Sequence, residues 1–125
     1  MLFRSEADPY ADGVAASLPV WQAIVPTIWP LEIANAVLMG ERRQRSTEAQ
    51  AVKWFGYLTS LPIVIDEETG NHAWSDVLNL ARAHQLSAYD AAYLELALRR
   101  GLGLATLDQK LKAAASFLGL SLFTP

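Results

Sequence analysis

Short apolar runs alternate along the chain with stretches in which apolar residues recur at helical spacing, and this alternation constrains the fold most. The runs that predict strands lie near Ala23–Trp29, Pro62–Asp66, Leu102–Leu107 and Leu120–Phe123. Strands that are separated by helices pair in parallel through crossover connections. We therefore expect an α/β fold, with helices on both faces of a mostly parallel sheet.

Residues that commonly begin or end helices mark the stretches between these strands. Thr47, with Gln50 three residues later, has the pattern of a capping box. Ser87 and Asp108 stand at N-cap positions, and Gly101 stands where a helix commonly ends. The predicted helices are Pro9–Leu18, one that begins near Leu31, one after Thr47, a long one after Asp66, one after Ser87 that is strongly helical over Ala91–Arg100, and Gln109–Leu118.

Composition narrows the class of protein. The chain has 125 residues and contains no linker, repeat or low-complexity stretch, so residues 1–125 are expected to form one domain. It has no cysteine, which excludes disulfides, thiolate zinc sites and cysteine nucleophiles. Its net charge of −3 does not suit a basic nucleic-acid coat. The chain has no apolar run of the ~18 residues that a membrane span needs and no signal peptide, so we expect a cytoplasmic protein.

Three acidic residues stand where the predicted topology brings strand ends and helix starts together. Glu32 and Asp108 follow predicted strands, and Asp90 lies in the first turn of the helix that Ser87 begins. The carboxyl ends of parallel strands meet at one edge of a sheet, where functional crevices form. Clustered carboxylates repel one another unless a cation neutralises them, and ligands that are all oxygen suit Mg²⁺ or Mn²⁺. A bound metal that activates water beside a phosphate would make a phosphodiester hydrolase.

Each acid also has a purely structural explanation. An acid in the first turn of a helix stabilises the helix by about 0.3–1 kcal/mol through the helix dipole, without any function. Asp108 could serve only as an N-cap, and Asp90 only as part of a capping box. The residues alone leave both interpretations open.

A resemblance to a known family bears on this choice. Three segments resemble motifs of PIN-domain ribonucleases, and in particular of the VapC toxins of bacterial toxin–antitoxin pairs: Trp29–Ala36, Leu86–Ala97 and Leu104–Asp108. By the order and spacing of these segments, the resemblance extends over essentially the whole chain. Glu32, Asp90 and Asp108 fall on acidic metal-site positions of that family, and Thr106 falls on its hydroxyl position. The resemblance implies a three-layer sandwich and an Mg²⁺- or Mn²⁺-dependent endoribonuclease toxin. It also implies a homodimer and a cognate antitoxin that neutralises the toxin.

The chain departs from the family at its amino terminus. Family members begin with a strand that ends in an aspartate, whereas Met1-Leu2-Phe3 matches only the end of that segment. We therefore expect an N-terminally short PIN-like domain whose activity depends on the missing ligand. The alternative function is an inactive or impaired module that only binds antitoxin or RNA.

Other polar residues have weaker functional interpretations. Asn35, one helical turn after Glu32, could hydrogen-bond a metal ligand. Arg42, Arg43 and Lys110 are candidate RNA contacts, although the arginines also suit a solvated helix end. His72, His84, Arg99 and Arg100 are interpreted as surface or packing residues without a site. The aromatic residues Trp54, Phe55 and Tyr57 predict either core packing or a groove for a partner segment.

Overall fold

Two short parallel strands lie between two groups of helices, within residues 29–59 and residues 69–117, which form the two halves of the molecule. A computed structural model describes residues 23–123, so the predictions for Pro9–Leu18 and Met1–Phe3 lie outside the described residues. Strand β1 (Ala23–Pro26) is fully buried and pairs with β2 (Ile63–Asp66), with Ala23 opposite Ile63 and Pro26 opposite Asp66. The parallel pairing of the first two predicted strands is therefore confirmed.

Strand β1 ends earlier than predicted because side chains replace the ladder after Pro26. The Thr27 hydroxyl donates to the backbone carbonyl of Asp66 at 2.8 Å, and the Thr27 amide donates to Thr69 Oγ1 at 3.2 Å. Pro26 itself has no amide hydrogen to offer a neighbouring strand. The chain therefore turns at Thr27 and Ile28 and enters a helix.

The strands predicted over Leu102–Leu107 and Leu120–Phe123 are wrong in extent. Within the described chain they reduce to one parallel bridge between Leu104 and Leu122. The Leu104 amide donates to the Ser121 carbonyl and the Phe123 amide to the Leu104 carbonyl, both at 2.8 Å. After this bridge the backbone turns toward the next helix, so no ladder continues. The fold is α/β and mostly helical, with a small sheet, and the three-layer sandwich stays a prediction.

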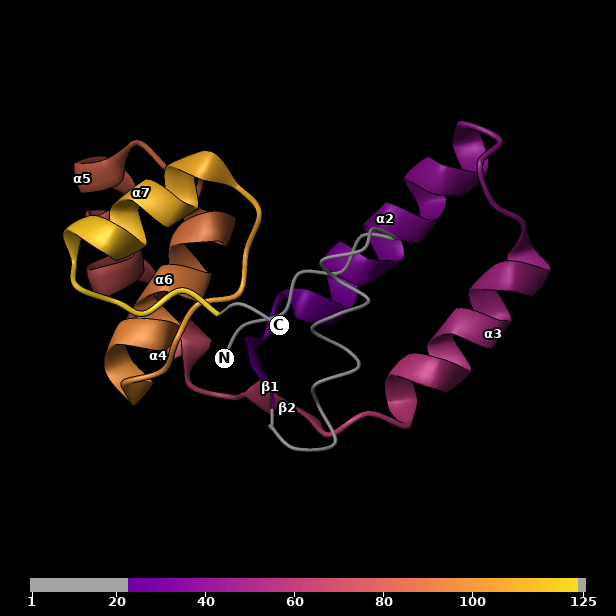
Figure 1. Cartoon of the computed structure of the whole chain (residues 1–125), viewed down its shortest axis with the longest axis horizontal. Coiled ribbons are helices and arrows are strands. Elements are labelled where there is room, and N and C mark those ends of the chain that lie inside the picture. The colour runs from indigo at the N-terminus through magenta and orange to yellow at the C-terminus, as the bar shows by residue number, and fades with distance from the viewer. Residues whose placement is uncertain (1–22, 124–125) are drawn as a thin grey trace.

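Helices α2 (Trp29–Arg42) and α3 (Glu48–Thr59) lie on one side of the strands (Figure 1). Pro30 suits the first turn of α2, which needs no amide hydrogen there. The predicted capping box of α3 is confirmed: Thr47 Oγ1 accepts from the Gln50 amide at 3.2 Å, and Gln50 Oε1 accepts from the Thr47 amide at 2.9 Å. Among residues 23–123, no helix combines the length and apolar character that crossing a bilayer requires.

The long helix predicted after Asp66 is interrupted by a wider turn. Helix α4 (Thr69–His72) passes into the π-helical turn η1 (Ala73–Val77) and then into α5 (Leu78–His84). Single π-helical turns inside helices are rare and are frequently found at functional sites. Asp76 lies within this turn, four residues after His72.

The best-buried helix of the described part is α6 (Ala88–Arg100), on which α7 (Gln109–Phe117) packs. All residues of α6 from Ala91 to Ala97 are buried. The apolar residues between Tyr93 and Ala97 meet Leu104 and Leu111 in one cluster, whereas Ala91 and Ala92 pack with Val77 in another. The predicted caps are confirmed. Ser87 Oγ accepts from the Asp90 amide at 3.1 Å, Asp108 Oδ1 accepts from the Leu111 amide at 2.8 Å, and Gly101 ends α6 at a φ of 64°.

Candidate functional site

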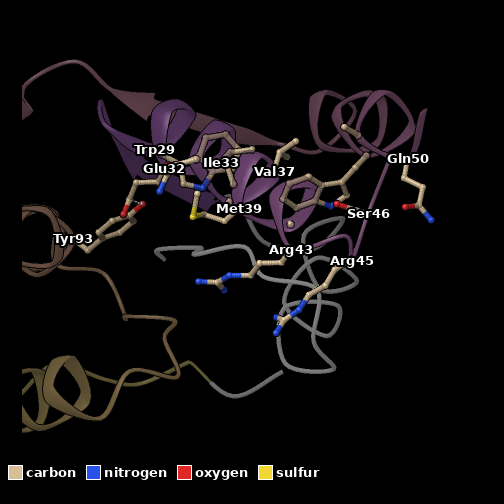
Figure 2. A pocket seen from close by; sticks show the side chains of 15 residues that line it. Trp29, Glu32, Ile33, Val37, Met39, Arg43, Arg45, Ser46, Gln50 and Tyr93 are labelled. Carbon is tan, nitrogen blue, oxygen red and sulfur yellow. Dashed lines mark hydrogen bonds between the residues drawn. The ribbon is translucent and has the colours of Figure 1, made fainter. Parts of the chain in front are cut away.

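A single side-chain contact joins the first turn of α2 to the middle of α6. The hydroxyl of Tyr93 donates a hydrogen bond to Glu32 Oε1, across 61 residues of sequence (Figure 2). Tyr93 is only 2% exposed, so its ring is fixed by the apolar cluster around α6. The Glu32 carboxylate is therefore held against α6.

Asp90 lies on the same face of α6 as Tyr93. The two residues are three positions apart, which puts their side chains next to each other on a helix surface. Asp90 is half-buried, and its amide is held by Ser87. The acids of the first two sequence motifs thus belong to adjoining surfaces of α2 and α6.

Asp108 comes from the third motif, at the start of α7. Helix α6 has 13 residues and is about 20 Å long. The connection from Leu102 to Asp108 is long enough, at about 23 Å when extended, to return along it. Figure 1 shows the chain turning back in this way after α6. Thr106 is 4% exposed, and its Oγ1 accepts from the Asp108 amide at 3.1 Å, which fixes the turn that presents Asp108.

The three acids do not form a direct ligand set in this structure. In the part of the chain that is described, the ligand atoms of Glu32, Asp90 and Asp108 do not all lie within 4.8 Å of one another. Mg²⁺ in proteins commonly keeps several waters and touches only one or two carboxylates. Their convergence around one hydrated ion therefore stays a prediction.

A groove of about 740 Å³ adjoins Glu32 and runs along α2 toward α3 (Figure 2). Of the other predicted site residues, Asn35 and Arg43 line it, whereas Arg42 and Lys110 are exposed and do not. Trp29 also lines the groove. Its indole Nε1 is buried and has no hydrogen-bond partner among residues 23–123. The groove therefore has a carboxylate, an unsatisfied donor and a guanidinium along its wall.

A second set of charged residues, which sequence reasoning missed, joins the end of β2 to α6. Arg99 donates to both oxygens of Asp66, at 3.1 and 2.7 Å, and to both oxygens of Glu95, at 2.7 and 3.1 Å. The side chains of Asp66 and Glu95 are 2% and 4% exposed. The interpretation of Arg99 as a residue without a site is therefore wrong, since it neutralises two buried carboxylates.

Two signals in the sequence could have found this network. Asp66 ends a predicted strand, and Asp108 was expected to follow one. The rule that functional residues stand at the carboxyl ends of strands therefore applies to Asp66 as well. Glu95 interrupts an apolar run on α6, and Arg99 stands four residues later, at the spacing of helical ion pairs.

His72 and Asp76 extend the same network toward solvent. His72 Nδ1 lies 3.4 Å from Asp76 Oδ2 and 3.5 Å from Glu95 Oε1. Together the three residues offer ligand atoms that all lie within 4.8 Å of one another, so they could hold a metal ion. His72 was interpreted as lacking a partner. That interpretation is wrong, and the one-turn spacing from His72 to Asp76 was the available signal.

Hydrogen bonds fix the protonation of the network. Those from Arg99 hold the pKa of Asp66 below its usual range, although burial of the carboxyl opposes this shift. The bonds to Asp66 and Glu95 raise the pKa of Arg99, so the guanidinium stays charged. Asp66 and Arg99 are thus an ion pair at neutral pH.

The lowered pKa of Asp66 predicts a stability that depends on acid pH. Its contribution is complete above the unfolded pKa of about 3.9 and is lost as pH falls through the lower pKa of the folded state. We expect the free energy of unfolding to fall below about pH 4. Asp66→Asn should be less stable than the unmodified chain at pH 7, and its free energy of unfolding should depend less on pH. Urea unfolding between pH 3 and 7 measures this, with the exposed Glu67→Gln as control. Equal slopes for Asp66→Asn and the unmodified chain would contradict it.

Comparison with known proteins identifies no relative. No protein-family model matches the chain, and no curated protein matches it.

Proposed function

We propose that the chain is a metal-dependent endoribonuclease of the PIN-domain toxin type, which hydrolyses RNA phosphodiester bonds. The observation that supports it most is the hydrogen bond from Tyr93 to Glu32. This bond ties together two of the three segments that carry the resemblance. If Glu32 only stabilised the helix dipole, it would not need a buried tyrosine to orient its carboxylate along the groove.

The chemistry assigns a role to each acid. Glu32, Asp90 and Asp108 hold Mg²⁺ or Mn²⁺, partly through metal-bound waters. Such an ion, when bound, lowers the pKa of a water and offsets the charge that develops on the phosphate. Tyr93 fixes the direction of the Glu32 carboxylate, and Thr106 fixes the backbone of Asp108.

The groove supports single-stranded or looped RNA as the substrate. Arg43 lies along the groove from Glu32 and would bind a phosphate of the same strand. The side chain of Trp29 forms part of the groove wall, although its indole Nε1 is buried. Asn35 stands beside Glu32 in the groove as a further polar contact. Arg42 and Lys110 would contact RNA outside the groove.

Partner binding is part of the proposal. Helices α2 and α3 expose large apolar side chains, which are those of Leu31, Leu38, Val52, Phe55 and Tyr57. Such surfaces often mark protein interfaces. We propose that helices α2 and α3 contact a second copy of the chain and a cognate antitoxin. An arginine of the antitoxin would neutralise the clustered acids through paired hydrogen bonds.

The test is cleavage of a labelled single-stranded RNA by the purified chain. We expect cleavage in Mg²⁺ or Mn²⁺, slower than a site with a fourth carboxylate would give, and none in EDTA. Asp108→Asn is the informative variant, because asparagine caps a helix as well as aspartate does but carries no charge. It should lower the rate on the order of 100-fold, while the free energy of unfolding falls by no more than the ~0.3–1 kcal/mol of the lost helix-dipole interaction.

The matched control is Glu48→Gln, which removes an exposed acid from the first turn of α3, away from the site. It should cleave like the unmodified chain. Cleavage that persists in EDTA, or in Asp108→Asn, contradicts the proposal. RNA or antitoxin binding without any cleavage would instead favour the binding module.

A further inference from the structure

His72, Asp76 and Glu95 come together where η1 packs on α6, on residues that the proposed nuclease does not use. A groove of about 550 Å³ opens beside them, and Asp76, Glu95 and Arg99 line it. Its other walls come from α5, α6 and the residue that follows α7. The inner carboxylate of this group is therefore buried, yet the group has an entry path from solvent.

The separations of the ligand atoms fit a shared ion better than direct hydrogen bonds. His72 Nδ1 lies 3.4 Å from Asp76 Oδ2 and 3.5 Å from Glu95 Oε1. Good hydrogen bonds between nitrogen and oxygen are about 2.7–3.2 Å long. Two ligands bound tetrahedrally at about 2.0–2.1 Å from one ion are about 3.3–3.4 Å apart. The imidazole nitrogen thus already has nearly this spacing to each carboxylate, and the ligand atoms of the two carboxylates lie within 4.8 Å of each other.

Charge also favours a cation here. The carboxylates of the network are Asp66, Asp76 and Glu95, and its guanidiniums are Arg99 and Arg100. One negative charge therefore remains while His72 is neutral. Arg99 does not block Glu95, because a carboxylate oxygen accepts more than one partner. By fixing the Glu95 carboxylate, Arg99 acts as the outer partner that metal ligands commonly have.

The types of ligand atom in this group indicate which metal ion it would bind. One imidazole nitrogen with two carboxylate oxygens suits Zn²⁺, whereas Mg²⁺ prefers oxygen ligands only. His72 directly precedes a π-helical turn and Asp76 lies within it, and such turns are frequently found at functional sites. We propose that His72, Asp76 and Glu95 form a zinc site with three protein ligands, separate from the acids of the proposed nuclease. Its remaining positions face the groove and are filled by water or a small anionic ligand.

Zinc titration of the metal-free chain tests this site without any assay of activity. Because Zn²⁺ can also bind the nuclease acids, millimolar Mg²⁺ is added to occupy them. We then expect calorimetry to give one tightly bound Zn²⁺ per chain, which Mg²⁺ does not displace, and zinc to raise the melting temperature. His72→Gln and Asp76→Asn should each weaken zinc binding at least tenfold. Both side chains are at least partly exposed, so neither change threatens the fold. Glu95 is left intact because Arg99 depends on it.

Two further variants locate the bound ion. His84→Gln removes the other histidine of the chain, which lines the same groove but lies outside the ligand set, and it should bind zinc normally. Asp90→Asn should also bind zinc normally, which separates this site from the nuclease acids. The proposal is overturned if the unmodified chain binds no stoichiometric zinc. It is also overturned if His72→Gln binds zinc as tightly as the unmodified chain, or if His84→Gln or Asp90→Asn loses zinc while His72→Gln retains it.

Discussion

Replacing Arg99 by methionine is expected to lower the free energy of unfolding by about 3–5 kcal/mol, the range measured when one partner of a buried ion pair is removed. The change leaves Asp66 and Glu95 without the guanidinium that binds both oxygens of each. Both carboxylates are almost wholly buried, so water cannot replace the lost bonds. Because domains are stable by only about 5–15 kcal/mol, a large part of the population is expected to be unfolded at 37 °C.

Urea unfolding, followed by tryptophan fluorescence, measures this loss. Arg99→Lys keeps the charge but cannot form the paired hydrogen bonds, so it should fall between the unmodified chain and Arg99→Met. Arg82→Met is the control, because Arg82 is exposed and makes only a 3.5 Å contact with Asn79. A loss below about 1 kcal/mol for Arg99→Met, as for a surface pair, would show that the network contributes little.

Asp90→Asn is expected to reduce RNA cleavage on the order of 100-fold or more while it leaves the fold intact, provided that the proposed function holds. Asparagine has nearly the size of aspartate and loses only the charge that would bind the metal. The Ser87 cap uses the backbone amide of residue 90, so this bond survives the change. The interaction of the charge with the helix dipole, worth about 0.3–1 kcal/mol, is lost.

Cleavage rate, Mn²⁺ affinity and melting temperature should be measured on the same preparation of Asp90→Asn. The expected pattern is a large loss of rate, weaker Mn²⁺ binding and a melting temperature within a few degrees of the unmodified chain. Glu48→Gln again serves as the control, because it also removes an acid from the first turn of a helix. Full activity in Asp90→Asn would remove this residue from the site.

Local signals in the sequence predicted local structure well. Thr47, Ser87, Asp108 and Gly101 were expected to cap or end helices, and each does so. A cap depends on residues within one helical turn, so the sequence carries the whole signal. The first two strands were also found because β-branched runs bounded by turn signals are local patterns.

Features that depend on distant partners were predicted poorly. A ladder over Leu102–Leu107 required a neighbouring strand along its whole length, and only Leu104 has such pairing in the described chain. Arg99 was treated as a solvated helix end, because neither hydrophobic periodicity nor charge pattern shows that Asp66, 33 residues away, lies beside it. The Tyr93 bond to Glu32 likewise became visible only in three dimensions.

The bonds of Arg99 to both Asp66 and Glu95 also affect how the molecule comes apart. Asp66 ends β2 and Arg99 lies in the last turn of α6, so the guanidinium bridges the sheet and the best-buried helix. At intermediate separations the three charges would be neither paired nor hydrated, which is their least favourable state. Gradual loosening of α6 from β2 is therefore opposed more strongly than complete separation. This network makes the joint between the two halves cooperative, with docked and undocked forms and few states between them.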